Sequence, residues 1–230
     1  MKYLGLIFIC LGLAFPALAE DAGRITVSGE GRSSETPDMA TITMGVSHED
    51  KTAMAALAVV NESTRKLLEE MKAMGIEDRD LQTSQLSLNP QWTYVKKGGR
   101  ERNEITGYVA SNLVTARIRD LDNLGVVLDK VVASGANTFR GLNFGFADAS
   151  PLMDEAREMA VKDARHKAEL LADAAGVELG RLVTISEAGM VPPPMPMARA
   201  SMEAMSDAVP IAQGELTLTA RVTLVYEIEE

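Results

Sequence analysis

The sequence predicts an α+β protein in which long amphipathic helices cover antiparallel or mixed sheets. Two observations lead to this class. Several stretches alternate apolar and polar residues, as strands with one buried face do, and the longest of them is Glu215–Glu229. Between them lie stretches whose apolar residues recur at steps of three and four, as in helices with one buried face. The helices are therefore expected to cover the strands.

Residues 1–19 have the features of a signal peptide. Lys2 gives a positive start, Tyr3–Phe15 is an apolar run too short to span a bilayer comfortably, and Ala17–Ala19 fits the small-x-small cleavage rule. We therefore expect export to the periplasm and removal of this segment. The mature chain, residues 20–230, then has about 211 residues, enough for a sizeable core in one large domain or two small ones.

Composition excludes several classes of site and partner. The chain's one cysteine, Cys10, lies inside the signal peptide, so the mature protein has no disulfide, thiolate nucleophile or cysteine-based metal site. The formal net charge is −10 at pH 7 with no basic stripe, which argues against nucleic acid as a partner and against simple adsorption to anionic lipid. No later segment is long and apolar enough to span a membrane. We expect a soluble periplasmic protein.

Two strands open the mature chain. Arg24–Glu30 alternates apolar and polar residues before a glycine, which predicts a strand that ends there in a turn or bulge. Pro37-Asp38 is a turn signal, and Met39–His48 alternates again after it.

A helix and a long hairpin follow. Apolar residues recur at helical spacing from Ala53, and Gly75 stands where the helix is expected to end. Leu81–Val95 and Ile105–Arg119 resume the alternation on either side of a polar tip, Lys97–Arg100. These features predict an antiparallel hairpin.

A second helix and a short strand come next. Asp120 or Asp122 is placed to cap a helix whose leucines and valines share one face, and Gly135 closes it. The short strand is expected near Phe139–Phe144.

The third helix carries a stripe of small residues. We expect Ser150 at its N-cap, Pro151 at its first helical position, and its end at Gly176. Alanines recur every four residues along it: Ala156, Ala160, Ala164, Ala168 and Ala172. Because a row of small side chains lets another backbone come close, this helix is expected to press on a sheet or on a neighbouring helix.

Two strands complete the pattern. Arg181–Ser186 is short, whereas Glu215–Glu229 places its apolar residues on one face over its whole length. We expect that face to meet a core, and the other face to meet solvent or a subunit.

The segment at about residues 189–210 is rich in methionine and proline. Pro192–Pro194 favour an extended linker, and residues 198–209 carry apolar side chains at a spacing typical of a short docking helix. Thioethers are also soft ligands suited to Cu(I), and they oxidise reversibly to sulfoxides. The candidate metal or oxidant-binding residues are Met190, Met195, Met197, Met202 and Met205. The sequence leaves the linker, the metal site and the oxidant sink open.

The rest of the chain offers no convergent set of catalytic groups. His48 and His166 lie on different predicted elements, and neither accompanies a recognisable serine nucleophile pattern. Asp154 and Glu158 share a helix face, but acidic residues near a helix N-terminus are explained by the helix dipole. We therefore expect a protein that is not an enzyme and that holds no cofactor.

Several blocks of the sequence resemble the SIMPL-domain family of exported bacterial proteins. They are "ITVSGEG" with "PDMATITMGV", then "ITGYVASN", "VTARIRDLDNLGVVLDKVVASGAN" and "AVKDARHKAELLADAAGVELGRLVTISE". The blocks occur in the family's order over nearly all of residues 20–230, which we interpret as one SIMPL-like domain. The chain resembles especially the periplasmic or outer-membrane-associated immunogenic antigens of Gram-negative pathogens and their stress-related relatives.

This resemblance implies an α+β fold, a homo-oligomer that forms a ring or channel-like particle, and a link to oxidative or envelope stress. It implies no catalytic residue set. We therefore expect a non-enzymatic, self-assembling periplasmic protein with a protective or scaffolding role, and a possible peripheral association with the outer membrane. The alternative hypothesis is a Met-rich periplasmic protein that binds Cu(I) or scavenges oxidants.

Overall fold

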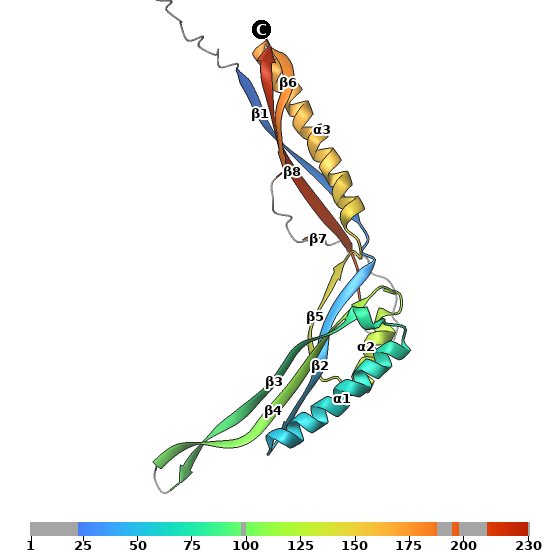
Figure 1. Cartoon of the computed structure of the whole chain (residues 1–230), viewed down its shortest axis with the longest axis vertical. Coiled ribbons are helices and arrows are strands. Elements are labelled where there is room, and N and C mark those ends of the chain that lie inside the picture. The colour runs from blue at the N-terminus through green and yellow to red at the C-terminus, as the bar shows by residue number, and fades with distance from the viewer. Residues whose placement is uncertain (1–22, 98–99, 188–194, 198–210, 230) are drawn as a thin grey trace, which may run out of the picture.

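The computed structural model describes residues 23–97, 100–187, 195–197 and 211–229, which form two sheet-and-helix units placed end to end (Figure 1). The predicted signal peptide, residues 1–19, lies outside the described residues. The α3 unit contains β1 (Arg24–Glu35), α3 (Ser150–Ala175), β6 (Glu178–Glu187), β7 (Met195–Met197) and β8 (Glu215–Glu229). The α1 unit contains β2 (Met39–Asp50), α1 (Ala53–Ala73), a 3-10 turn (Asp78–Asp80), β3 (Leu81–Lys97), β4 (Arg100–Ile118), α2 (Leu124–Ala133) and β5 (Thr138–Gly145).

Both sheets are antiparallel, which confirms the predicted α+β class. The sheet of the α3 unit has the strand order β1-β8-β6, with β7 paired to the first residues of β8. The sheet of the α1 unit has the order β3-β4-β2-β5. β1 pairs with β8 over its whole length, from Arg24 opposite Glu227 to Glu35 opposite Leu216. The first and last strands of the described residues therefore pair with each other in one unit.

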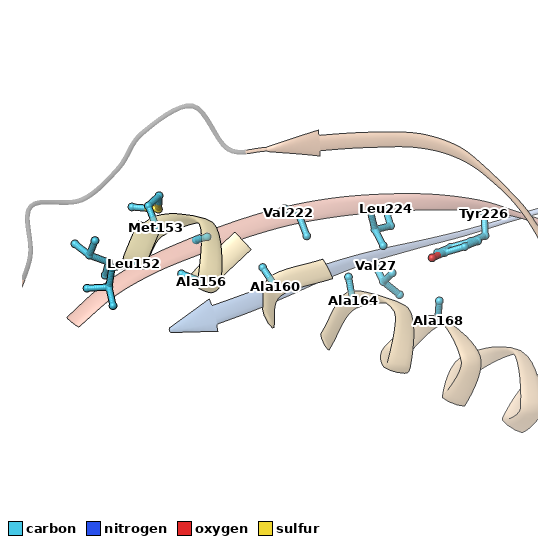
Figure 2. Packing of buried hydrophobic residues seen from close by; sticks show 12 residues of the cluster. Val27, Leu152, Met153, Ala156, Ala160, Ala164, Ala168, Val222, Leu224 and Tyr226 are labelled. Carbon is cyan, nitrogen blue, oxygen red and sulfur yellow. The ribbon is translucent and has the colours of Figure 1, made fainter. Parts of the chain in front are cut away.

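The alanine stripe of α3 is the buried face of that helix, as the sequence predicts. All five alanines are almost or completely inaccessible to solvent, and α3 packs on β1 and β8. Figure 2 shows four of them, Ala156, Ala160, Ala164 and Ala168, beside these strands. The core of this unit consists of Val27, Leu152, Met153, Ala156, Ala160, Ala164, Ala168, Leu218, Ala220, Val222, Leu224 and Tyr226. The partner of the stripe is a sheet, and the apolar face of β8 supplies the larger side chains.

The prediction that the first strand ends in a turn or bulge at its glycines was wrong. β1 continues through Gly29 and Gly31 to Glu35 without a register shift against β8. These glycines are required by close packing. A Cβ atom at Gly29 would lie 2.1 Å from the carbonyl oxygen of Ala160, and one at Gly31 would lie 2.0 Å from that of Ala156. The backbone of the strand thus touches the backbone of the helix.

The ends of α3 differ slightly from the prediction. Ser150 is the first helical residue and Ala149 takes the N-cap position, so the expected serine cap was wrong by one residue. The Ser150 backbone N–H instead donates to the Asp148 carboxylate at 2.9 Å, which satisfies one of the free donors of this helix end. The C-terminal prediction is confirmed, because Gly176 ends the helix with a left-handed φ of 71°.

The core of the α1 unit is built from larger side chains. α1 begins after Thr52, whose hydroxyl accepts a hydrogen bond from the Ala55 N–H at 3.2 Å, and Gly75 follows its end with a φ of 87°. Both helices cover one face of the sheet. The main cluster contains Ala40, Ile42, Met44, Leu67, Met71, Ala116, Ile118, Leu124, Val127, Leu128 and Val131.

The predicted aspartate cap of the second helix was wrong. α2 starts at Leu124 with Asn123 at its N-cap, and no side chain caps it. Asp120 instead accepts hydrogen bonds from the backbone and side-chain N–H groups of Asn123. Asp120 therefore fixes the turn that precedes the helix, a competing role that acidic side chains take readily in turns.

The predicted long hairpin is confirmed; its strands extend further toward the tip than expected, and β4 ends one residue earlier, at Ile118. β3 and β4 pair from Leu81 opposite Ala116 to Lys97 opposite Arg100, with register shifts near Ser84 and after Gln91. The hairpin projects away from the rest of the α1 unit (Figure 1). The short strand β7 was not predicted, because a three-residue strand inside a Met-Pro segment has no detectable alternation.

Candidate assembly surfaces

The outer edges of the sheets differ in how they are protected. β1 and β6 are the edges of one sheet, and β3 is an edge of the other. α3 covers the β1 edge with side chains: the Asp163 carboxylate accepts from the Glu30 backbone N–H at 2.8 Å, and the Lys167 ammonium donates to the Ser28 carbonyl at 3.1 Å. Such cover prevents an edge from pairing with another chain. No such cover from a helix side chain is present along β6 or β3 in the described residues.

The charges on the β1 edge are held firmly in place. The Lys167 ammonium lies 2.6 Å from the Asp163 carboxylate, and this contact, followed by the Glu30 N–H, lowers the pKa of Asp163. The Glu30 carboxylate binds Arg221 and Arg32, which lowers its pKa as well. The β1 edge is therefore closed by groups that stay ionised at neutral pH.

β6 carries a first exposed apolar surface. Its residues Leu182, Val183 and Ile185, which we call the edge strip, are all exposed, and Ile185 is 56% accessible to solvent. The strip is exposed because α3 packs mainly on β1 and β8. α3 reaches β6 through an ion pair between the Arg157 guanidinium and the Glu187 carboxylate at 2.8 Å, and Leu179, near the start of β6, packs against the core that α3 lines. Leu182 and Ile185 lie opposite Tyr226 and Leu224 of β8, and the edge strip stays exposed within the described residues.

The β3–β4 hairpin carries a second exposed apolar surface. Leu86, Leu88, Trp92 and Tyr94 are an even number of residues apart along β3, so they point to one face, and Ile105 lies opposite Trp92. We call these five residues the hairpin strip. Trp92, the chain's one tryptophan, is 59% exposed, and Tyr94 is 76% exposed. A contiguous exposed apolar surface with aromatic side chains is typical of an interaction site.

The hairpin strip is exposed because it lies on the edge strand β3, which α1 covers only in small part. Leu88 pairs with Ala110, which is buried beneath α1 in a small cluster with Ala56 and Val60. The strip therefore runs on the helix-covered face of the sheet, but on the edge strand, whereas α1 packs mainly on β2 and β4. If another surface covered this strip, burial of each large apolar side chain would contribute about 1.5–3 kcal/mol to the binding free energy.

The candidate methionines are only partly described. Met195 and Met197 lie in β7, opposite Thr217 and Glu215 of β8, and their side chains are outside the described residues. Met190, Met202 and Met205 lie outside the described residues altogether. The predicted docking helix at 198–209 also falls there. A convergent Met site therefore stays a prediction.

The remaining candidates for chemistry do not come together. His48 lies on β2 of the α1 unit and His166 on α3 of the other unit. Asp154 and Glu158 each pair with a basic residue of their own helix, Arg157 and Lys162. Among the described residues, no group of three or more histidine, cysteine, aspartate or glutamate side chains is arranged to hold a metal ion.

Sequence reasoning missed both strips. The alternation that predicted β3 and β6 as strands already contained their apolar residues, including Trp92 and Ile185. Alternation shows that one face of a strand is apolar, but it does not show whether a helix covers that face. The one available signal was the position of an aromatic pair, Trp92 and Tyr94, close to the polar tip of a long hairpin.

Helices of the described chain are all too short or too polar to cross a membrane.

Comparison with known proteins gives a consistent result. The model of the SIMPL family, described as a protein of unknown function (DUF541), matches residues 25–226. The chain is 41% identical to the 26 kDa periplasmic immunogenic protein of Brucella melitensis over 228 residues, covering 94% of this chain and 91% of the relative. It is 32% identical to uncharacterized protein YggE of Edwardsiella ictaluri (70% and 66% covered) and 27% identical to that of Escherichia coli K12 (91% and 85% covered).

Proposed function

This chain belongs to the SIMPL family, and from that premise we propose that it assembles with copies of itself into a closed particle that protects or scaffolds the envelope. The chain is periplasmic, as are the Brucella relatives by their names. In this proposal it catalyses no reaction and holds no cofactor, and its activity lies in the assembled surface.

One observation carries the proposal: the described residues include an exposed apolar strip on each of the two units. The edge strip lies on β6 at one end of the elongated molecule, and the hairpin strip lies toward the other end (Figure 1). Because the two strips are different surfaces, contact between the edge strip of one copy and the hairpin strip of the next is heterologous. Contacts of this kind repeat from copy to copy and close into a ring when the rotation between copies allows it.

The open strand edges support the same geometry. Within the described ranges, β6 pairs only with β8 and β3 only with β4, so each has an outer side without a strand partner there. A strand edge that is both apolar and free of covering charges invites pairing with another chain. The β1 edge, which α3 closes, is excluded from this role. The proposal therefore assigns β6 and β3 as the assembling edges.

The assembly is tested with two complementary variants of the mature protein. The hairpin variant carries Trp92→Ser and Tyr94→Ser, and the edge variant carries Leu182→Lys and Ile185→Lys; all four side chains are exposed, so the fold should be retained. Light scattering should give one large, concentration-independent mass for the unmodified protein and a monomer mass for each variant. Loss of an aromatic anchor at an interface commonly weakens binding by about 30-fold or more.

An equal mixture of the two variants identifies the type of contact. The intact edge strip of the hairpin variant should bind the intact hairpin strip of the edge variant, giving a one-to-one pair that cannot grow. Dimers in either variant alone would show instead that each strip binds its own copy. Leu170→Ser is the matched control, because Leu170 is an exposed leucine of α3 outside both strips. A monomeric unmodified protein would refute the assembly proposal.

The protective role is supported by the family resemblance, which links such proteins to oxidative and envelope stress. We test it in cells of the source bacterium that lack this chain, scoring survival after peroxide and after detergent treatment. The unmodified chain should restore survival, and the hairpin variant should not. Equal survival with the unmodified chain and with the hairpin variant would show that protection does not require assembly. Membrane fractionation of the same cells tests the predicted peripheral outer-membrane association.

The Cu(I) or oxidant alternative stays a prediction with a direct test. Replacing the five candidate methionines together by leucine keeps the apolar volume but removes the thioethers. A Cu(I) titration that gives equal affinity for the variant and the unmodified chain would exclude the metal site. Peroxide consumption by the variant and by the unmodified chain is measured in parallel, and equal rates would exclude the oxidant sink.

A further inference from the structure

A cavity of about 280 Å³ lies in the α1 unit, apart from both strips. It is formed where the end of α1, the end of β4 and the first turn of α2 meet. Its apolar wall consists of Met74, Ile76, Ile118, Val126 and Val127. A concave apolar wall with a few polar groups beside it is the usual form of a small-molecule site, and this volume lies just below the usual range for such sites.

The polar side of the cavity contains three carboxylates, and each already has a partner. Asp80, whose side chain is 4% exposed, accepts from Nε and Nη2 of Arg119, both at 3.0 Å. Glu77 pairs with Arg79 at 2.8 Å. Asp120 accepts from the backbone and side chain of Asn123. The acidic groups are therefore committed within the chain, and they leave little to attract a cation.

Arg117 is the lining residue whose charge is not committed. No hydrogen bond or ion pair of its guanidinium occurs within the described ranges. Asp80, the last residue of the 3-10 turn, comes just before Leu81, which pairs with Ala116, the neighbour of Arg117. The positive charge of Arg117 contributes to the low pKa of Asp80, after the larger contributions of Arg119 and Arg79. Arg119 donates from Nε and Nη2 to Asp80, and its Nη1 group has no acceptor among the residues that the structure describes.

We infer that this cavity binds a small amphipathic carboxylate, with its hydrocarbon part against the apolar wall and its carboxylate on Arg117 and the Nη1 group of Arg119. Guanidinium groups bind carboxylates with strong, directional hydrogen bonds, which fits two arginines beside one cavity. The volume limits the ligand to a short or medium chain. This site is independent of the assembly, because none of its lining residues belongs to either strip.

Octanoate is the probe, titrated into the mature protein by calorimetry and by NMR of the backbone amides. Saturable binding is expected, with shifts at Gly75, Asn123 and Val126. Octylammonium, which has the same chain and the opposite charge, should not bind there. Saturable binding of octylammonium with equal affinity, or octanoate shifts confined to other parts of the chain, would overturn the assignment. Absence of octanoate binding at millimolar concentration would overturn it as well.

Two variants test the charge of Arg117 and the apolar wall of the cavity separately. Arg117→Gln should weaken octanoate binding about tenfold or more, since it removes a charged hydrogen-bond donor. Arg140→Gln, the matched change of another exposed arginine in the same sheet, should leave the affinity unchanged. Val126→Ser alters a wall residue that is 49% exposed, so the fold should be retained while octanoate loses more affinity than butyrate does. Equal affinities for Arg117→Gln and the unmodified chain would refute the role of Arg117.

Discussion

Both units pack helix against sheet, but the α3 unit does so with small residues and the α1 unit with large ones. In the α3 unit a helix lies on a sheet through alanines and glycines, so that a Cβ at Gly31 would come within 2.0 Å of a helix carbonyl. In the α1 unit the helices lie on the sheet through large side chains such as Ile42, Met44, Leu67 and Met71. The helix and sheet of the α3 unit therefore share backbone contact, whereas those of the α1 unit share interdigitated side chains.

This difference teaches where each unit is sensitive to change. A core of small residues has no side chain that can move aside, so added volume displaces backbone. A core of large residues contains rotamers that can adjust to added volume, but it loses contacts and leaves a cavity when volume is removed. The α3 unit should be intolerant of enlargement and the α1 unit intolerant of truncation. Three substitutions test this contrast.

The largest effect is expected for Ala164→Leu in the α3 unit. Ala164 is completely buried against β1 beside Gly29, and a leucine there must push helix and strand apart. We expect the free energy of unfolding to fall by about 3 kcal/mol or more, measured by urea denaturation. Ala174→Leu is the matched control on an exposed position of the same helix and should change stability by less than about 0.5 kcal/mol. Unchanged stability and assembly in Ala164→Leu would contradict the close contact.

A somewhat smaller effect is expected for Leu67→Ala in the α1 unit. Leu67 of α1 is fully buried in the main cluster, and its truncation should cost about 3 kcal/mol through lost contacts and a cavity. Leu67→Met, which keeps the volume, should cost less than about 1.5 kcal/mol. Thermal unfolding by circular dichroism measures both. A larger loss for the methionine than for the alanine variant would show that this core is as rigid as that of the α3 unit.

The smallest effect concerns the ion pairs of the two units. Asp80 in the α1 unit is nearly inaccessible and binds Arg119 through two hydrogen bonds, whereas the Asp163 side chain in the α3 unit is 34% exposed. Asp80→Asn should cost about 2 kcal/mol at pH 7, and Asp163→Asn less than about 1 kcal/mol because solvent screens its charge. Urea denaturation of both variants at pH 7 checks this order.

The pH dependence of these two variants follows from the direction of the pKa shifts. The folded-state pKa values of Asp80 and Asp163 are both lowered, by Arg119 and by Lys167 first. Each carboxylate therefore stabilises the folded state above its unfolded pKa of about 3.9, and this contribution is lost as the pH falls through the folded-state value. The stability difference between the unmodified chain and Asp80→Asn should shrink below about pH 4. A difference that grows at low pH would contradict the assigned ion pair.

Much of the fold was predictable because its signals are local. Alternation predicted the long strand β8, and the alanines predicted which face of α3 is buried, since both patterns repeat with the period of their element. Helix ends at Gly75 and Gly176 were predictable because glycine adopts the left-handed conformation required there. The N-caps of α2 and α3 were not, because neighbouring aspartates bind turn and helix N–H groups equally well without occupying the cap position.

The candidate surfaces and the cavity were not predictable from the same patterns. Trp92 and Ile185 have the same alternating context as the buried residues of β8, and their exposure depends on which strands the helices reach. The cavity joins residues from the end of α1, the end of β4 and the start of α2, which the chain brings together only after folding. No spacing in the sequence relates Arg117 to Ile76 or Val126.

The sequence by itself determined the α+β class, most elements and the close-packed face of α3, because propensity and periodicity act within one element. Only the tertiary structure decided that β1 runs straight through Gly29 and Gly31, since the reason is the backbone of α3, which is distant in sequence. It also decided which apolar faces stay open. Burial is a property of the layer that covers a strand, and the width of that layer relative to the sheet is set only when the elements pack.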